Sequence, residues 1–199
     1  LDAPNNGSYL FDKTEVAGYN EKQRAGIRKA NIGFIFQNFN LIDELTVFEN
    51  VELPLIYNNV KSSERKERVK EILERIGIAH RAKHYPLQLS GGQQQRVFIA
   101  RALCQEADIF FLDEPFVGVD ILTEEKIISI LKRLAKEGKT LLVVHHDLST
   151  VEQYFDKVIL LNQRLIAYGD TETTFTNENM AKCYGPQLTI LNKAGLLND

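Results

Sequence analysis

The residues with the clearest chemical meaning form the run Leu89–Arg96, which reads LSGGQQQR. Ser90 and Gln93 have the spacing of a capping box, so we expect a helix to begin here. Gly91 and Gly92 would fall in its first turn, where glycine costs stability but lets another group approach the backbone closely. Free N–H groups and the positive end of the helix dipole favour an anion, most often phosphate. The alternative is an ordinary capped helix with incidental glycines.

Two adjacent carboxylates follow an apolar run: Ile109–Leu112 leads into Asp113 and Glu114, and Pro115 comes next. In open α/β sheets, ligands bind at the carboxyl ends of strands, and adjacent strand residues point to opposite faces. One carboxylate could hold Mg²⁺, which prefers oxygen ligands and keeps part of its water shell. The other could orient or deprotonate an attacking water. The alternative is a turn that happens to be acidic.

A third polar group, His145-His146-Asp147, follows the apolar pair Val143-Val144. A histidine at the end of a strand can donate a hydrogen bond to a phosphate oxygen or hold a catalytic carboxylate. A structural loop residue is the alternative, and the pattern does not tell which of the two histidines would act.

The elements that must position these groups alternate between strands and helices. Short apolar runs predict strands over 32–36, 108–113, 140–145 and 157–161. Periodic apolar positions, capping residues and stop glycines predict helices from Thr46 to about Pro54, where the helix should kink or stop, over 62–76, from Ser90 onward, and over 124–137. The chain after residue 161 reads as helix-rich. This order predicts an α/β fold with a mostly parallel sheet, interrupted by a helical insertion over 41–89.

Composition narrows the function classes. The net charge of −3 argues against a nucleic-acid partner, which would need a basic surface. Cys104 and Cys183 lie far apart without a CxxC pair, so neither a zinc site nor a disulfide framework is indicated. The apolar runs are far shorter than the roughly 20 residues that span a bilayer, and no signal peptide is visible.

Together these motifs resemble the ATP-binding subunit of ATP-binding cassette (ABC) transporters. The residues that carry the resemblance occur in the family's order: Gln37, LSGGQ at Leu89–Gln93, the strand ending in Asp113-Glu114, and His146-Asp147. The resemblance covers nearly the whole chain. It implies the P-loop NTPase fold of ABC ATPases, as one domain over 1–199 that lacks its N-terminal part, with a helical subdomain over 41–89.

The resemblance also implies roles for individual residues. Glu114 would activate the hydrolytic water, His146 would sense the γ-phosphate, and Gln37 would reach the metal and the water. Asp113, assisted by Gln37, would hold Mg²⁺. The ATP held by the opposite subunit would contact Ser90, Gly91, Gly92 and Gln93. Asp120, in the segment VGVD, would lie in the loop that crosses the dimer interface.

The partners implied by the resemblance are ATP, Mg²⁺ and two proteins. One is a second ATP-binding subunit, either identical or different. The other is a membrane permease, which would dock near Gln37–Tyr57 and place this chain at the cytoplasmic face of the cell membrane.

One expected part is absent from the 199 residues. The phosphate-binding loop G-x-x-x-x-G-K-[ST] should precede Gln37, but nothing there fits it. Asp2–Phe11 instead resembles the segment that follows the P-loop helix. A truncated chain and a degenerate subunit are both open, and we favour truncation because the downstream catalytic positions are intact. These residues alone should bind and hydrolyse ATP poorly or not at all.

The two halves resemble different branches of the family. Ile32–His84 resembles the lipoprotein-release, macrolide-export and cell-division branch, whereas the chain from Val97 onward resembles the manganese, zinc and iron-chelate uptake branch. We favour metal uptake because the second half is the more distinctive match. An export or lipoprotein-release ATPase, and a catalytically dead regulatory or non-transport ABC protein, remain alternatives.

Overall fold

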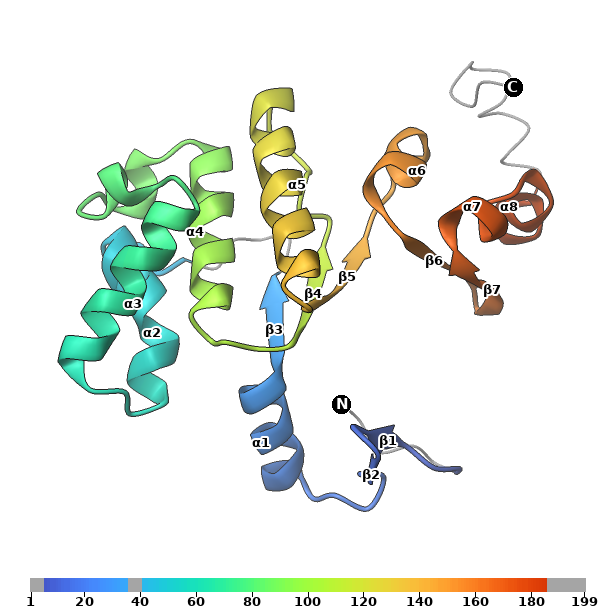
Figure 1. Cartoon of the computed structure of the whole chain (residues 1–199), viewed down its shortest axis with the longest axis horizontal. Coiled ribbons are helices and arrows are strands. Elements are labelled where there is room, and N and C mark those ends of the chain that lie inside the picture. The colour runs from blue at the N-terminus through green and yellow to red at the C-terminus, as the bar shows by residue number, and fades with distance from the viewer. Residues whose placement is uncertain (1–5, 36–40, 186–199) are drawn as a thin grey trace. The chain divides into compact units, whose positions relative to one another are not determined.

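The computed structural model describes residues 6–35 and 41–185. The chain forms two compact units, Leu1–Val144 and His145–Asp199, and each is described by itself below. Figure 1 labels the helices and strands of both units. Gln37, one of the predicted site residues, lies outside the described residues. The boundaries proposed above, one domain over 1–199 with a subdomain over 41–89, stay a prediction.

A three-stranded parallel sheet lies at the centre of the first unit, in the order β3-β4-β5 (Figure 1). The strands are β3 (Ile32–Ile35), β4 (Ile109–Asp113) and β5 (Thr140–Val144). They confirm the three strands predicted for this region and their parallel pairing. β4 begins one residue later than expected and β5 ends one residue earlier, before His145.

One face of this sheet is buried and the other is partly open. On the buried face, Phe110 and Leu112 are almost fully covered, and Gly33 leaves room for the ring of Phe110, since a Cβ there would lie 2.6 Å from it. Helix α4 (Gly91–Leu103) contacts β3, and helix α5 (Ile121–Lys136) contacts β5. On the other face, Phe34 and Phe111 stack with ring centroids 5.5 Å apart and are partly exposed.

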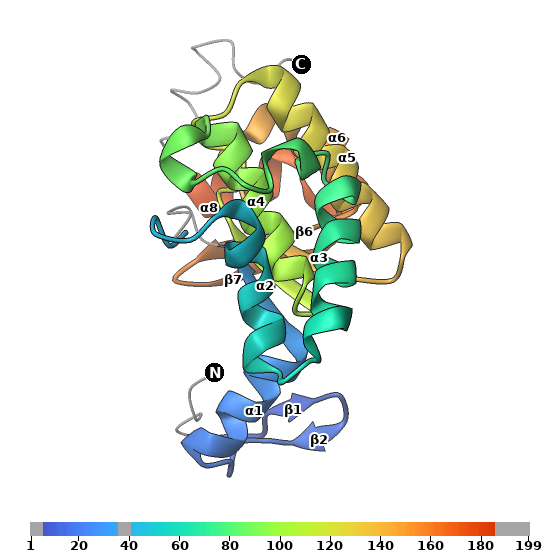
Figure 2. The same cartoon turned by 90° about the vertical axis from the view of Figure 1, so that its left-hand side faces the viewer.

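The segment between β3 and α4 is helical, as predicted. It contains α2 (Val47–Tyr57), α3 (Ser62–Arg75) and the short 3₁₀ helices η1 (Ala79–Arg81) and η2 (Pro86–Gln88). In Figure 2, α2 and α3 lie in front of α4, and α2 contacts both of the other helices. Gly77, at φ +71°, follows the end of α3 as expected: its N–H donates to the carbonyl of Glu74, and that of Ile78 donates to Leu73.

Two helix boundaries differ from the predictions. Of the two outcomes predicted at Pro54, a kink or a stop, the stop does not occur: α2 continues to Tyr57, and Val47, Val51 and Leu55 bury one side of the helix. Helix α5 begins at Ile121, three residues before the predicted start. The reason is its N-cap, Asp120, whose carboxylate accepts from the backbone N–H of Thr123 at 3.0 Å.

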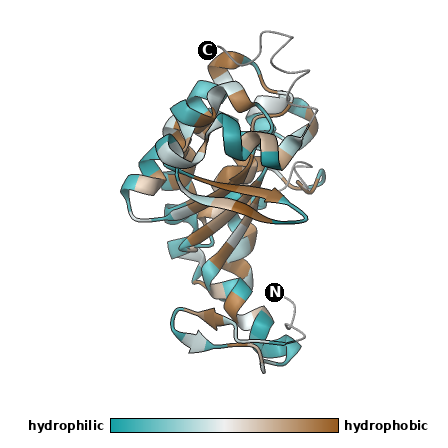
Figure 3. Ribbon diagram, turned by 90° about the vertical axis from the view of Figure 1, so that its right-hand side faces the viewer, coloured by the Kyte–Doolittle hydropathy of each residue, from teal (hydrophilic) through white to brown (hydrophobic). Residues whose placement is uncertain are grey.

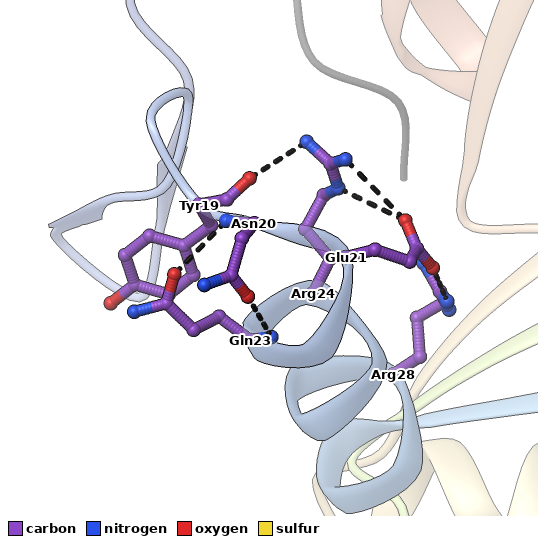
Figure 4. A network of polar contacts seen from close by, with 6 residues as sticks. All are labelled: Tyr19, Asn20, Glu21, Gln23, Arg24 and Arg28. Carbon is purple, nitrogen blue, oxygen red and sulfur yellow. Dashed lines mark hydrogen bonds and ion pairs between the residues drawn. The ribbon is translucent and has the colours of Figure 1, made fainter.

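The first part of the chain contains elements that the sequence patterns did not predict. Strands β1 (Leu10–Phe11) and β2 (Thr14–Glu15) form an antiparallel pair, and helix α1 covers Glu21–Asn31. No residue of α1 is buried, so apolar periodicity could not reveal it. Polar contacts hold its first turns instead (Figure 4): Asn20 and Gln23 form a capping box, and Glu21 pairs with Arg24 and Arg28.

The second unit begins with η3 (Leu148–Thr150) and α6 (Val151–Tyr154), followed by a hairpin of β6 (Lys157–Asn162) and β7 (Arg164–Asp170). Helices α7 (Thr171–Thr174) and α8 (Asn177–Tyr184) follow. The predicted strand over 157–161 is confirmed. The prediction of a helix-rich tail after it was wrong for β7, because the chain reverses through Gln163 at φ +57°, with no glycine to mark the turn.

The β6–β7 hairpin is apolar on both faces. Leu160 packs against Met180 of α8 on one face. Four large side chains on the other face are about half exposed or more: Ile159, Leu161, Leu165 and Tyr168. Figure 3 shows this apolar colouring along the two strands. Among the described residues of both units, no helix is long and apolar enough to cross a membrane.

Candidate functional site

Helix α4 begins with the predicted capping box. The hydroxyl of Ser90 accepts from the backbone N–H of Gln93 at 3.4 Å, and the side-chain oxygen of Gln93 accepts from the N–H of Ser90 at 3.0 Å. Ser90 and Gly91 are exposed, whereas Gly92 is buried. The exposed backbone at the start of α4 is therefore suited to an external anion.

The two glycines serve different purposes. A Cβ on Gly92 would lie 2.6 Å from the Cγ2 atom of Thr123 in α5, which is far inside contact distance. A Cβ on Gly91 would meet nothing closer than the carbonyl oxygen of Gly118 at 3.8 Å. Gly92 is thus required by the packing of α4 on α5, and Gly91 is the glycine that an external group can approach.

Asp113 and Glu114 stand at the carboxyl end of β4, as predicted. Asp113 is the last residue of the strand and is exposed. The next residue, Glu114, has a left-handed backbone with φ +48°, which costs a non-glycine residue roughly 1–2 kcal/mol. The backbone N–H of Glu114 donates to the carbonyl of Val144 at 3.1 Å, and its carbonyl accepts from Val117 at 3.2 Å. The chain therefore turns sharply away from the sheet immediately after Asp113.

A further residue of this site was not predicted from the sequence. Gln95 of α4 is buried, and its Nε2 atom donates to the carbonyl oxygen of Pro115 at 3.0 Å. The signal was available, because Gln95 shares a helix face with buried Phe98 and Ile99, where a polar side chain needs a partner. This bond brings α4 and the turn after Glu114 together.

Asp120 has a definite structural role in this unit. Its carboxylate caps α5 by accepting from the N–H of Thr123 and from the hydroxyl of the same residue at 2.8 Å. These hydrogen bonds, the side-chain one first, lower the pKa of Asp120. Its predicted place in a dimer interface stays a prediction.

The two neighbouring histidines belong to the second unit and differ in their surroundings. His145 is half-buried, its Nε2 atom lies 2.7 Å from the hydroxyl of Thr150, and its ring meets that of Phe155 edge-on at 5.4 Å between centroids. His146 is exposed. Asp147 accepts from the N–H of Ser149 at 3.0 Å and so fixes the turn that follows. Of the two histidines, His146 is the one that a ligand can reach.

Within the first unit, the structure brings together the start of α4, the turn from Glu114 to Gly118 and the Asp120 cap. The described residues contain no group of three or more His, Cys, Asp or Glu side chains that could hold a metal ion. Asp113 therefore stands outside any such cluster of described residues, and a bound phosphate and water are further ligands of the kind that Mg²⁺ usually takes.

The sequence pattern that defines the ABC transporter family matches residues 1–117 of this chain. The chain belongs to the ABC transporter family. This ABC protein has the mixed α/β fold of the family's ATP-binding cassettes. Its similarity to the dimeric cassette MJ0796, solved in a post-hydrolysis state bound to ADP and Pi, reaches a TM-score of 0.74 at 38% identity. That similarity covers 85% of this chain and 75% of MJ0796.

Two curated relatives represent the two branches named above. The manganese transport system ATP-binding protein MntB of Bacillus subtilis is 58% identical over 63% of this chain and 50% of MntB. The macrolide export ATP-binding/permease protein MacB 1/2 of Paracoccus denitrificans is 41% identical over 84% of this chain and 25% of MacB. The matched part of this ABC protein thus spans half the length of MntB.

Proposed function

We propose that this ABC protein hydrolyses ATP to drive transport, with a phosphate-binding loop that these 199 residues do not include, as a dimer with a second ATP-binding subunit beneath a membrane permease. The observation that carries the proposal is one arrangement in the first unit. An exposed, capped, glycine-containing helix start is joined to the turn that carries two carboxylates at the end of a parallel strand. Phosphoryl transfer needs mainly positioning and charge stabilisation, and these groups supply both.

In this proposal each group has one task. Glu114 orients or deprotonates the attacking water, and Asp113 holds Mg²⁺, which neutralises phosphate charge. Ser90, Gly91, Gly92 and Gln93 present the start of α4 to the γ-phosphate of ATP bound by the opposite subunit. His146 senses the γ-phosphate of ATP, and Asp120 lies in the loop that crosses the dimer interface. Gln37 reaches the metal and the water.

For the transported substrate we propose a metal ion of the manganese, zinc or iron-chelate class. The support is the 58% identity to the manganese protein, which exceeds the 41% identity to the macrolide exporter. Export or lipoprotein release is the second candidate, because the macrolide exporter matches over a larger share of this chain. A regulatory subunit without catalytic activity is the third candidate function.

We propose that the permease docks on the segment Gln37–Tyr57, at the cytoplasmic face of the membrane. Support comes from a groove of about 580 Å³ lined by Ile42, Pro54, Tyr57, Lys29 and Arg101, among others. Its lining is largely apolar and includes the two basic side chains Lys29 and Arg101, which suits a short segment with apolar and acidic side chains. Tyr57 is 70% exposed, so a large aromatic side chain is available for contact.

Copurification tests the docking surface. Tyr57→Asp and Leu41→Asp should each abolish copurification of the permease, and Leu87→Asp is the matched control, because Leu87 is 80% exposed and outside the groove. Equal retention of the permease by Tyr57→Asp and Leu87→Asp would exclude this surface.

ATP turnover of the assembled transporter tests the catalytic assignment. Glu114→Gln removes the base and should lower turnover by about 10²-fold or more. Glu125→Gln, an exposed carboxylate on α5, should leave turnover unchanged. Wild-type turnover in Glu114→Gln would overturn the role of Glu114.

A further inference from the structure

We infer that Gln95 is a positioning residue for Glu114: the Gln95 amide fixes the turn from Glu114 to Val117 against helix α4, and so couples the Glu114 carboxylate to the exposed start of that helix. The contact stands on the geometry alone. Its catalytic consequence rests on the function proposed above.

The turn from Glu114 to Val117 is held by hydrogen bonds to neighbouring groups. Glu114 adopts a left-handed backbone, a conformation that L-residues disfavour and that a following proline disfavours further. Such a conformation persists only where surrounding contacts fix it. The bonds from Glu114 N–H to Val144 and from Val117 N–H to Glu114 fix one side of the turn.

Pro115, the residue after Glu114, offers only one backbone group for a hydrogen bond. Proline has no N–H, so the carbonyl is the backbone group by which this residue can be held. The Nε2 atom of Gln95 donates to that carbonyl at 3.0 Å, and the Gln95 side chain is only 2% exposed. In such a buried site water does not readily replace a lost donor. Removal of the Gln95 amide therefore leaves the Pro115 carbonyl without this hydrogen bond.

The far end of the same loop is also linked to helix α4. Gly92 of α4 packs against Thr123, and Thr123 binds the Asp120 carboxylate. Residues 114–120 are thus fastened to α4 near both ends, while Val117 between them is 53% exposed. A movement of the α4 start is therefore transmitted to Glu114 through Gln95.

Amide hydrogen exchange on this chain tests the contact without any need for activity. Gln95→Met keeps a similar volume but removes the donor, and the Val117 and Glu114 amides should then exchange about tenfold faster. The matched control is Gln94→Met, because the Gln94 amide donates at 2.9 Å to the carbonyl oxygen of Pro86 and not to the turn that carries Glu114. Unchanged exchange of both amides in a folded Gln95→Met variant would overturn the inference. Should Gln95→Met fail to fold, Gln95→Asn keeps the amide but cannot reach Pro115, and the same increase is expected.

Turnover of the assembled transporter tests the catalytic consequence. Gln95→Met should lower kcat about tenfold and leave KM unchanged, since it displaces Glu114 rather than a binding group. In the Glu114→Gln background the same substitution should have no further effect. An equal loss in both backgrounds would show that Gln95 does not act through Glu114. Wild-type turnover in Glu114→Gln alone would reject the proposed function but leave the exchange result standing.

Discussion

At the scale of single residues, Gly92 and Gly91 should respond in opposite ways to the same substitution. Gly92→Ala places a methyl group 2.6 Å from Thr123, and overpacking of this kind costs about 1–3 kcal/mol. Gly91→Ala meets only ordinary contact at 3.8 Å and should leave stability equal or slightly higher. Urea unfolding of the two variants measures the difference. Similar midpoints for both would contradict the packing assigned to Gly92.

The two cysteines should also differ. Burial raises the pKa of Cys104 to about 12, so its thiol stays protonated and unreactive near neutral pH. Iodoacetamide at pH 8 should therefore label Cys183, which is less buried, well before Cys104, as measured by mass spectrometry. Because the folded pKa of Cys104 is raised, its contribution to stability is complete below pH 9 and falls between pH 9 and about 12. Equal labelling rates of Cys104 and Cys183 in the native chain would refute the predicted difference in their reactivity.

At the scale of elements, the cap of α5 gives an acid-dependent prediction. Hydrogen bonds from Thr123 lower the pKa of Asp120, so the cap stabilises the fold above the ordinary pKa of aspartate. That contribution is lost as pH falls through the lowered value. Thermal unfolding should show a smaller acid-induced drop in Tm for Asp120→Asn than for the unmodified protein, because asparagine keeps an oxygen acceptor but does not titrate. The same drop in both proteins would indicate that Asp120 does not contribute to acid sensitivity.

Elements with a buried face could be predicted from the sequence, and those without one could not. β3, β4 and β5 each carry large apolar side chains, and Ser90 and Gly77 mark helix ends by their types. Helix α1 has no fully buried residue, and β7 follows a turn without glycine, so neither has a strong local signal. The same limit applies to the site. Asp113 and Glu114 could be identified by type, and the position of Gln95 on an apolar helix face could indicate that its amide needs a partner. The identity of that partner, the Pro115 carbonyl, depends on tertiary contact.

At the scale of the whole molecule, the residues present set a limit on activity. The 199 residues contain no G-x-x-x-x-G-K-[ST] loop to hold the triphosphate, so this chain by itself should show no measurable ATP hydrolysis. A phosphate-release assay with Glu114→Gln as the reference checks this. Hydrolysis by the unmodified chain that disappears in Glu114→Gln would disprove the prediction, because it would place a complete phosphate site within these residues.

The β6–β7 hairpin has a practical consequence for anyone who prepares this protein. Its outer face exposes four large apolar side chains, Ile159, Leu161, Leu165 and Tyr168, on two paired strands. Contiguous apolar strand surface is the kind that drives aggregation when it stays uncovered in water. Yield and solubility should therefore depend on protein concentration and on coexpressed subunits. Polar replacements on this hairpin, such as Leu165→Thr, are the natural first step for obtaining the isolated chain in concentrated solution.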